Sequence, residues 1–407
     1  RLPCPNGKAT SIDFVKKPSE LSFGIPGSTL GIRDAFIFLR CSDLSGLARA
    51  QKICLLLRCL YQNQSNHSTC LFPAGTRETI SKPQFLKAMI KILANDGIHP
   101  DGKTLLEEAN YQVDTEKVAQ DDLPDVLPDY DVIIVRSATK VRKELIDVCP
   151  NLKIIARAGV GLDNIDVAYA KEKGIAVYNT PAASSESVAE LVFSHMFNLA
   201  RSVHQSNREL PKDDANFKAL KKAYSKGVQL RRKTIGIIGF GRIGQEVARI
   251  GLGTGMNVLA TDPMVDNVDI EIRLFANDDV RMTVNIETVS FEDVITKSDF
   301  LTFHVPSIGH ALVTAEEIAK MKDGAFIINT ARGGIADEQA VLDALNSGKL
   351  GGAALDVFEN EPTPRTDLLQ HPKISVTPHI GASTVEAQAN IGRELADKIL
   401  HHFGALD

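Results

Sequence analysis

The sequence predicts an α/β protein with two doubly wound parallel-sheet domains that follow a weakly ordered N-terminal extension. Short apolar runs of strand length alternate with helix-patterned segments from about residue 89 onward. A second series of the same kind starts at Thr234, directly before a glycine-rich turn. Strands that alternate with helices at this spacing are typical of parallel βαβ units, so two α/β domains are expected.

Composition limits the classes of protein that need to be considered. The chain has 407 residues, of which 43% are hydrophobic and 24% are charged, as in ordinary soluble globular proteins. The formal net charge of −5 argues against nucleic acid or an anionic membrane surface as a partner of the whole molecule. No apolar run approaches the roughly 20 residues that a membrane-spanning helix needs. We therefore expect no membrane segment.

Residues 1–82 differ from the rest of the chain in charge and in cysteine content. They hold 11 Lys and Arg against 5 Asp and Glu, so they carry +6 and leave −11 for the remainder. Five of the six cysteines lie there, without a zinc-binding spacing, and Cys149 stands alone in the body. A cysteine-poor body indicates a reducing compartment, so a cytoplasmic location and no metal site are expected. Residues 1–82 are expected to be a poorly ordered extension, with a basic targeting sequence as the alternative.

The first α/β series runs from residue 89 to residue 202. Apolar runs predict strands over 89–93, 130–135, 152–156 and 175–178. Helical periodicity predicts helices over 103–110, 167–173 and 184–202, and a further helix that ends with 146–149. The segment 207–232 is basic and polar, which is typical of an exposed helix and loop.

The second series has more strands than the first. Strands are predicted over 234–238, 257–261, 300–305, 325–329, 352–356 and 374–377, and helices over 243–252, 291–296, 315–320, 337–346 and 385–401. The stretch 266–286 fits neither the helical nor the strand period.

The glycine-rich turn carries the strongest functional motif. Gly239, Gly241 and Gly244 form a G-x-G-x-x-G pattern that follows a predicted strand and opens a predicted helix, and Asp262 ends the next strand. This context is the dinucleotide-binding fingerprint, in which the helix N-terminus holds the pyrophosphate. Asp262 is placed to accept hydrogen bonds from ribose hydroxyls and to repel a 2′-phosphate, so NAD is the expected cofactor. The alternative is a glycine turn that serves packing alone.

Three titratable residues follow later strands of the same predicted sheet. Arg332 follows 325–329, Glu361 follows 352–356 and His379 follows 374–377. Because ligands bind beyond the carboxyl ends of parallel strands, all three are expected to meet at one edge of the sheet. A guanidinium can bind a carboxylate, and an imidazole held by a carboxylate can transfer a proton. This set suits oxidation of a secondary alcohol next to a carboxylate, although each residue alone is more typical of a solvated loop.

Two further histidines, His195 and His304, are not expected to be catalytic. His195 lies inside an apolar helix and is expected to be a packing residue. His304 closes the predicted strand 300–305 and is expected to line the cofactor face without a catalytic role.

Six motifs between about residue 89 and residue 403 carry a family resemblance. Four of them are Gly239-Phe-Gly-Arg-Ile-Gly, Asn329-Thr-Ala-Arg-Gly-Gly, Gly352-Ala-Ala-Leu-Asp-Val-Phe-Glu-Asn-Glu-Pro and Pro378-His-Ile-Gly-Ala-Ser-Thr, and the two narrower ones are Val135-Arg-Ser-Ala-Thr-Lys and Ala156-Arg-Ala-Gly-Val-Gly-Leu-Asp-Asn. By the first four, the chain resembles the D-isomer-specific 2-hydroxyacid dehydrogenases. The two narrower motifs resemble members of that family that act on a phosphorylated acid.

The resemblance implies roles for individual residues. Arg332 would bind the substrate carboxylate, and Glu361 would orient His379, which takes the hydroxyl proton. Arg136 and Ser137 would bind the substrate, with its phosphate on Arg136, while Arg157 is either a further substrate ligand or a structural cation. The residues implied around NAD are Val160, Gly239, Gly241, Arg242, Ile243, Gly244, Asp262, Val305, Thr330, Ala331, Asp356, His379, Gly381 and Ala382.

The resemblance also implies a discontinuous domain arrangement. Residues 83–182 and 383–407 would form a flavodoxin-like substrate domain, and 183–382 a Rossmann NAD domain inserted into it. Relatives form homodimers or homotetramers, so a homo-oligomer is expected. The family does not account for 1–82, and a regulatory C-terminal domain found in some relatives is expected to be missing or truncated. The segments 264–288 and 306–312 deviate from the family pattern.

The reaction implied by the resemblance is NAD-dependent oxidation of 3-phospho-D-glycerate to 3-phosphohydroxypyruvate, the first step of serine biosynthesis. One alternative is the same chemistry on another small acid, such as glyoxylate or hydroxypyruvate. The other is a non-catalytic NAD-sensing protein that acts like a corepressor through protein partners.

Overall fold

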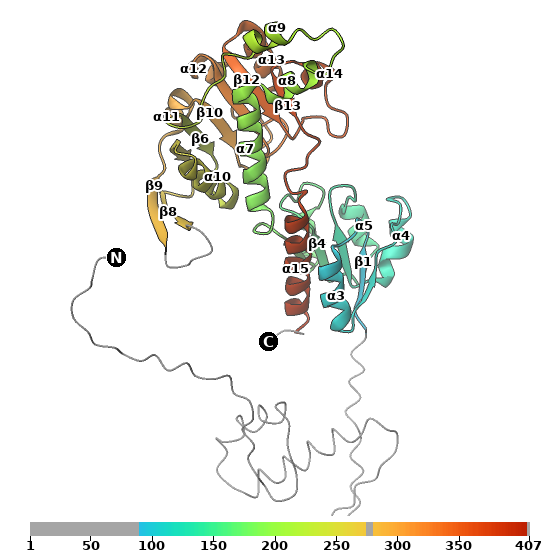
Figure 1. The fold of residues 1–407 in the computed structure, drawn as a ribbon. Helices are drawn as coiled ribbons and strands as arrows, with labels where there is room; N and C mark the ends of the chain where they lie inside the picture. The colour runs from blue at the N-terminus through green and yellow to red at the C-terminus, as the bar shows by residue number, and fades with distance from the viewer. Residues whose placement is uncertain (1–88, 274–279, 405–407) are drawn as a thin grey trace, which may run out of the picture. The chain divides into compact units, whose positions relative to one another are not determined.

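The computed structural model describes residues 89–273 and 280–404, which form two parallel sheets with helices on their faces (Figure 1). The expectations for residues 1–82 lie outside the described residues. None of the described helices is both long and apolar enough to cross a bilayer.

The first sheet has five parallel strands in the order β2-β1-β3-β4-β5. Its central strand β3 is buried at every position, which explains its unbroken run of Val and Ile. The strands are β1 (Lys91–Ala94), β2 (Gln112–Asp114), β3 (Val132–Val135), β4 (Ile154–Arg157) and β5 (Ala176–Asn179). The accompanying helices are α3 (Pro100–Glu108), α4 (Leu123–Val126), α5 (Lys143–Asp147) and α6 (Val167–Glu172). The sequence does not predict strand β2, because its three residues, of which one is buried, are too few to show an apolar run or an alternating pattern.

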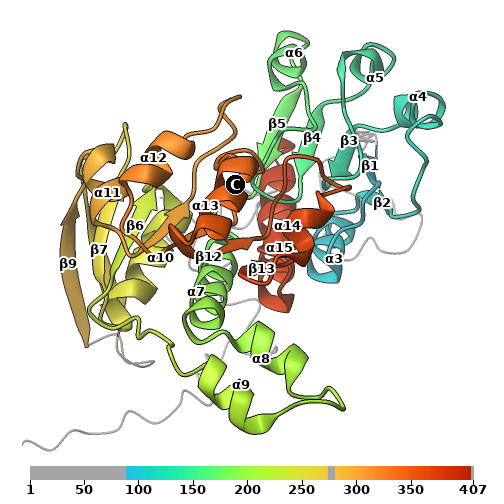
Figure 2. The same cartoon turned by 90° about the horizontal axis from the view of Figure 1, so that it is seen from above.

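The last helix of the chain packs on this first sheet. Helix α15 (Val385–His402) lies beside α3 in both views (Figures 1 and 2) and also contacts β4 and β5. The two helices approach closely at Gly102 and Gly392, where a Cβ on Gly102 would overlap the backbone of Gly392. Residues 385–402 therefore share a core with strands that precede them by more than 200 residues.

The second sheet has six parallel strands in the order β13-β12-β11-β10-β6-β7. Apolar cores cover both of its faces, as expected for a doubly wound sheet. The strands are β6 (Thr234–Ile238), β7 (Asn257–Thr261), β10 (Phe300–Phe303), β11 (Ala325–Asn329), β12 (Leu350–Leu355) and β13 (Ile374–Val376). The helices are α7 (Ser185–Arg201), α10 (Arg242–Gly253), α11 (Phe291–Lys297), α12 (Ala315–Lys320), α13 (Glu338–Ser347) and α14 (Thr366–Gln370).

Helix α7 belongs to the second sheet by its contacts. It packs against α10 and against β11, β12 and β13, and most of its apolar side chains are buried. The predicted split into a substrate domain and an inserted NAD domain is compatible with these contacts and stays a prediction.

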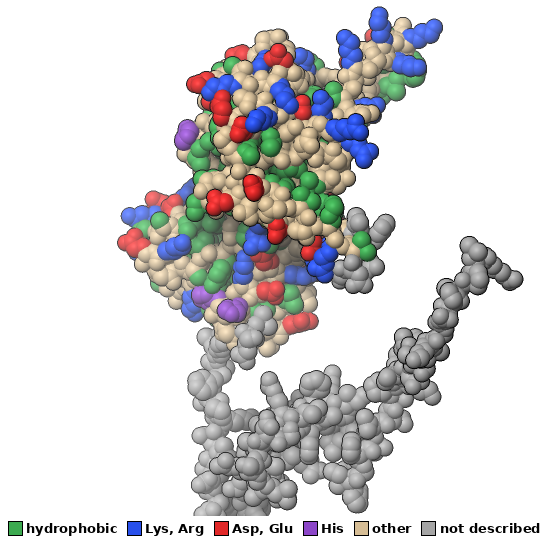
Figure 3. Space-filling model, turned by 90° about the vertical axis from the view of Figure 1, so that its left-hand side faces the viewer, with side chains coloured by type: hydrophobic (Ala, Val, Ile, Leu, Met, Phe, Trp, Pro, Cys, Tyr) green, Lys and Arg blue, Asp and Glu red, His purple; other side chains and the backbone are tan. Residues whose placement is uncertain are grey.

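Two segments with weak sequence patterns form regular structure. The stretch 266–286 covers all but the last residue of an antiparallel pair, β8 (Asn267–Arg273) and β9 (Arg281–Glu287), in which most side chains are exposed and Ile270 and Ile286 are buried in the core of the second sheet. The basic segment after α7 forms α8 (Val203–Glu209) and α9 (Phe217–Ala223), neither of which has a buried residue. Lys and Arg side chains gather at the top of the face drawn in Figure 3, at the level of α9 in Figure 1.

Candidate active site

The three glycines of the dinucleotide motif have three different local environments. Gly239 has a φ of 93°, and a Cβ there would lie 2.7 Å from the carbonyl oxygen of His304. A Cβ on Gly244 would overlap the carbonyl oxygen of Gly239, so helix and turn pack tightly there. Gly241, the N-cap of α10, has open space beside its Cα. The turn is therefore closed on the protein side and open where a pyrophosphate would approach.

Asp262 is anchored beside this turn. One carboxylate oxygen accepts the amide hydrogen of Phe240 at 2.8 Å, and the other accepts that of Met264 at 2.8 Å. These bonds fix the carboxylate at the carboxyl end of β7, next to β6. Each oxygen retains a second lone pair for a ribose hydroxyl.

The sheet order places the switch point of the winding beside the same turn. Strands β6 and β10 are neighbours, and the chain continues from β6 to β7 on one side and from β10 to β11 on the other. The winding direction therefore changes between β6 and β10, and a dinucleotide binds at such a switch point. Val305 follows β10 and contacts the Cβ position of Gly239. Thr330, at the end of β11, has a buried hydroxyl without a partner among the described residues. The open space at Gly241, the free donors of α10 and this hydroxyl fit a dinucleotide.

The remaining predicted cofactor contacts lie on segments near strand ends or helix starts. Arg242 and Ile243 form the first turn of α10, and Ala331 is buried just after β11. Val160 follows β4, and its carbonyl accepts the side-chain amide of Asn179 at 2.7 Å. Gly381 and Ala382 precede α15. Their contact with NAD stays a prediction.

His379 and Glu361 are directly paired. His379 Nδ1 lies 2.8 Å from Glu361 Oε2, and Glu361 Oε1 accepts the amide hydrogen of Phe358 at 3.0 Å. The backbone bond holds the carboxylate, which in turn holds one ring nitrogen and leaves Nε2 for another partner. A cavity of about 430 Å³ adjoins the pair and is lined by Phe358, Glu361, Pro362, Pro364, Leu369, Val376, Thr377, Pro378 and His379.

Asp356 holds the loop that presents His379. His379 has a φ of 53°, a left-handed conformation that side chains rarely adopt. Asp356 is 1% exposed and accepts hydrogen bonds from the Thr377 hydroxyl (2.6 Å), the Ile380 amide (2.8 Å) and the Gly381 amide (2.9 Å). The structure thus gives Asp356 a positioning role on both sides of His379, and its predicted NAD contact stays a prediction.

The two alternative histidines are both largely withdrawn from solvent. His195 bonds Ser375 Oγ through Nδ1 at 3.0 Å and Thr377 Oγ1 through Nε2 at 3.1 Å, which confirms the packing role. Burial lowers the pKa of His304 to about 3, so this side chain is neutral near pH 7. Its Nε2 bonds Thr302 Oγ1 at 3.1 Å.

Arg332 has a different partner from the other two predicted catalytic residues. Its strand β11 neighbours β12, which neighbours β13, so the three residues follow adjacent strand ends as predicted. Arg332 Nε, however, donates to Asp163 Oδ2 at 3.0 Å, and Arg332 does not line the cavity beside His379. The structure pairs Glu361 with His379, and it pairs Arg332 with Asp163, a carboxylate for which the sequence predicts no role.

Two other arginines act electrostatically on Arg157. Burial, with the positive charges of Arg332 and Arg136, lowers the pKa of Arg157 to about 10, while Asp96 and Asp163 act in the opposite direction. Arg157 Nη1 donates to the carbonyl oxygen of Ala158 at 2.6 Å, and its buried Nε has no partner among the described residues. The Asp163 carboxylate compensates part of this positive charge in the free protein, and an anionic substrate can compensate more of it.

Arg136 and Ser137 lie together after β3. Ser137 is exposed, and the Arg136 guanidinium makes no hydrogen bond or ion pair within the described ranges, although its backbone is tightly held. No group of three or more His, Cys, Asp or Glu among the described residues is arranged to hold a metal ion.

Comparison with known proteins identifies the family. The NAD-binding domain of the D-isomer specific 2-hydroxyacid dehydrogenases matches residues 193–381. A hydroxypyruvate reductase of Thermotoga maritima is 44% identical over 324 residues, which are 78% of this chain and 99% of that protein. A D-3-phosphoglycerate dehydrogenase of Methanocaldococcus jannaschii is 40% identical over 314 residues, which are 76% of this chain and 57% of that protein. The chain thus spans about half the length of the phosphoglycerate dehydrogenases that it matches.

A solved structure supports the cofactor. The crystal structure of an NAD-dependent formate dehydrogenase from Staphylococcus aureus in complex with NAD matches with a TM-score of 0.63 and 29% identity, over 78% of this chain and 96% of that one. The doubly wound fold, the glycine turn and the His–Glu pair define an NAD-binding oxidoreductase. The chain belongs to the D-isomer-specific 2-hydroxyacid dehydrogenase family.

Proposed function

We propose that this enzyme oxidises 3-phospho-D-glycerate to 3-phosphohydroxypyruvate with NAD. The observation that carries the proposal is the placement of the Arg157 and Arg332 guanidinium groups against one loop, 159–161, together with the positive charge that Arg136 adds near Arg157. A small monocarboxylate needs one guanidinium, whereas a substrate with both a carboxylate and a phosphate can use several. Membership in an enzyme family and the His–Glu pair favour catalysis over the non-catalytic alternative.

The proposed mechanism assigns a role to each paired group. Arg332 binds the substrate carboxylate, which takes the place of Asp163 on its guanidinium. His379 accepts the C2 hydroxyl proton on Nε2, while Glu361 holds Nδ1 and stabilises the imidazolium that forms. When bound, NAD supplies the hydride acceptor. Arg136 binds the phosphate and thereby orients the C2 hydrogen.

A competition between substrates tests the proposal. Initial rates of NADH formation are measured with 3-phospho-D-glycerate and with unphosphorylated D-glycerate, and then repeated with Arg136→Ala. We expect a higher kcat/KM for the phosphorylated acid, and we expect the substitution to remove most of that preference. Equal kcat/KM values in the unaltered enzyme would exclude the narrow substrate assignment.

Reduction of hydroxypyruvate is the second candidate function. Its support is the T. maritima hydroxypyruvate reductase, which shows higher identity than the phosphoglycerate dehydrogenase described above and is matched over 99% of its length. The same His379, Glu361 and Arg332 chemistry would run in the reducing direction on that substrate. A kcat/KM for hydroxypyruvate above that for its phosphorylated form would favour this candidate.

A further inference from the structure

Asp96 lies at the switch point of the first sheet. Strand β1 stands between β2 and β3, so the residues that follow β1 and β3 flank the position where the winding direction changes. Asp96 follows β1 and Arg136 follows β3, and these strands are paired from Ile92–Val132 to Ala94–Ile134. Ligands of open α/β sheets bind at such points.

The Asp96 carboxylate is saturated with bonds to the loop that begins at Arg136. Asp96 Oδ2 accepts the amide hydrogens of Arg136 (2.7 Å) and Thr139 (3.1 Å), and Oδ1 accepts the Thr139 hydroxyl (2.9 Å). The carboxylate is only 5% exposed, and its nearest cation is Lys117 Nζ, at 4.0 Å. Its charge is therefore balanced mainly by loop donors, which are the groups that it holds in place.

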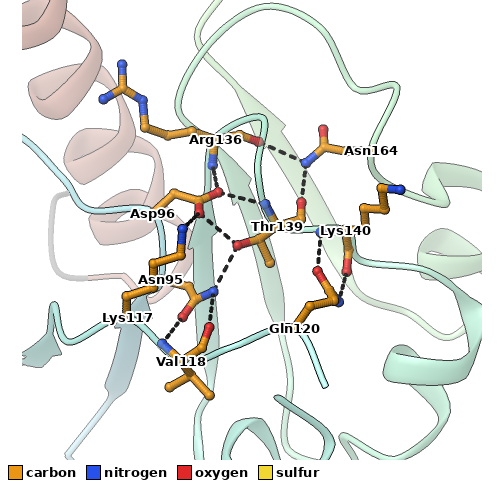
Figure 4. A network of polar contacts seen from close by, with 9 residues as sticks. All are labelled: Asn95, Asp96, Lys117, Val118, Gln120, Arg136, Thr139, Lys140 and Asn164. Atoms are coloured by element: carbon orange, nitrogen blue, oxygen red, sulfur yellow. Dashed lines mark hydrogen bonds and ion pairs between the residues drawn. The ribbon is translucent and has the colours of Figure 1, made fainter. Parts of the chain in front are cut away.

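Two asparagines hold the same loop from other sides. Asn164 Nδ2 donates to the carbonyl oxygens of Arg136 (2.8 Å) and Thr139 (2.6 Å). Asn95 Nδ2 donates to Thr139 Oγ1 at 2.8 Å. Figure 4 shows that the Arg136 guanidinium points away from this network, so the bonds hold the backbone and leave the charged group free for a ligand.

We infer that Asp96 is a positioning residue that fixes Arg136 for binding the substrate phosphate. The inference rests on the proposed function, because that function assigns the phosphate to Arg136. Asp96 does not touch the substrate in this scheme. It limits the orientations of the 136–139 loop, so the guanidinium meets the phosphate without a further ordering cost.

Asp131 provides a control for Asp96, because it is a carboxylate that holds the same strands without contacting the Arg136 loop. Asp131 joins the same two strands at their opposite ends, where Oδ2 accepts the Lys91 amide hydrogen at 3.0 Å and Oδ1 bonds Lys153 Nζ at 2.7 Å. Asp131→Asn removes a similar charge from the same sheet, far from the Arg136 loop. Its effect therefore measures what loss of a strand-end carboxylate does to the sheet alone.

A double-mutant cycle on Asp96 and Arg136 tests the inference. Asp96→Asn is isosteric but removes the charge: its amide oxygen can still accept from the loop N–H groups, while its NH2 group replaces the acceptor of the Thr139 hydroxyl, so the loop loses part of its anchoring. We expect KM for 3-phospho-D-glycerate to rise about tenfold, as for the loss of roughly one charge-assisted interaction. We expect kcat, KM for D-glycerate and NAD affinity to change less than about threefold.

The double variant decides whether Asp96 acts through Arg136. If it does, Asp96→Asn in the Arg136→Ala background should have no further effect on KM for the phosphorylated acid. Full multiplication of the two single effects would overturn the inference. So would an equal rise in KM for both acids, or the same result with Asp131→Asn. If Asp96→Asn does not fold, Thr139→Val removes one of the three bonds and should raise the same KM about threefold, and no rise would overturn the inference.

The Arg136→Ala variant separates the two proposals. If it leaves the preference for the phosphorylated acid unchanged, the phosphate assignment fails and the inference fails with it. If it removes that preference while Asp96→Asn leaves it intact, the proposed function stands and only the role of Asp96 is lost.

Discussion

Gly244 packs so closely against Gly239 that a Cβ atom on Gly244 would overlap the Gly239 carbonyl oxygen. Three residues earlier, Gly241 has nothing within 4 Å of the corresponding position. The packing of the turn against the helix therefore requires glycine at position 244. At position 241, glycine is required only if a ligand lies against the backbone.

This difference predicts opposite outcomes for two alanine substitutions. Gly244→Ala should lower the free energy of unfolding by about 1–3 kcal/mol, because the turn must move away from the helix. Gly241→Ala should leave stability within about 0.5 kcal/mol and weaken NAD binding, since its methyl group occupies the open side. Urea unfolding and NAD titration by isothermal calorimetry measure the two quantities. Equal loss of stability in both variants would contradict this division of roles.

Glu361 should matter for turnover, and its neighbour Glu359 should not. Glu361→Gln keeps an acceptor for the Phe358 amide but loses the charge beside His379, so we expect kcat to fall about 10–100-fold. His379→Ala should reduce kcat about 10²–10⁴-fold with unchanged NAD affinity. Glu359→Gln is the control, because Glu359 lines a separate hollow with His310 and Asp337. A large loss of kcat in that control would show that the pairing with His379 is not what matters.

Asp262 should determine the choice between NAD and NADP. Asp262→Asn retains one acceptor for the Phe240 amide and removes the charge that repels a 2′-phosphate. We expect the ratio of kcat/KM for NAD to that for NADP to fall about tenfold or more. Asp266→Asn changes an exposed acid of the same loop and should leave the ratio unaltered. Steady-state rates with both cofactors provide the measurement.

The buried histidines should make the folded protein sensitive to acid. Burial lowers the pKa of His195 and lowers that of His304 to about 3, whereas an unfolded histidine titrates near 6.5. Below about pH 6.5, these histidines bind protons in the unfolded chain but remain neutral in the folded chain. The free energy of unfolding therefore falls as the pH drops, by up to about 1.4 kcal/mol per pH unit for each histidine. For His304 this loss continues down to its folded pKa.

Unfolding in urea at pH 7 and pH 5 tests this linkage. His304→Asn should reduce the difference in unfolding free energy between the two pH values. The same substitution at His310, an exposed residue, is the control for loss of a histidine. An unchanged pH difference in His304→Asn would mean that His304 takes up a proton in the folded protein.

Much of the fold could be predicted because buried parallel strands leave an apolar run in the sequence. The ranges 234–238, 257–261 and 325–329 agree with the structure to the residue. The stretch 266–286 was expected to fit neither period, and this was wrong: β8 and β9 alternate polar and apolar side chains, which is the period of a half-buried strand, and they bury Ile270 and Ile286. Strands buried on both faces, which have continuous apolar runs, were therefore easier to predict than the half-buried pair.

The sequence by itself determined the dinucleotide turn, the pairing candidates Glu361 and His379, and the family, since each depends on local spacing or on motifs. Only the tertiary structure decided that Glu361 contacts His379 while Arg332 contacts Asp163, and that Asp96 holds the backbone of Arg136. Those contacts join residues 18, 169 and 40 positions apart, respectively. These contacts form because of the order of the strands in each sheet. Local periodicity does not encode that order, because the same strands could be arranged in a sheet in several different orders.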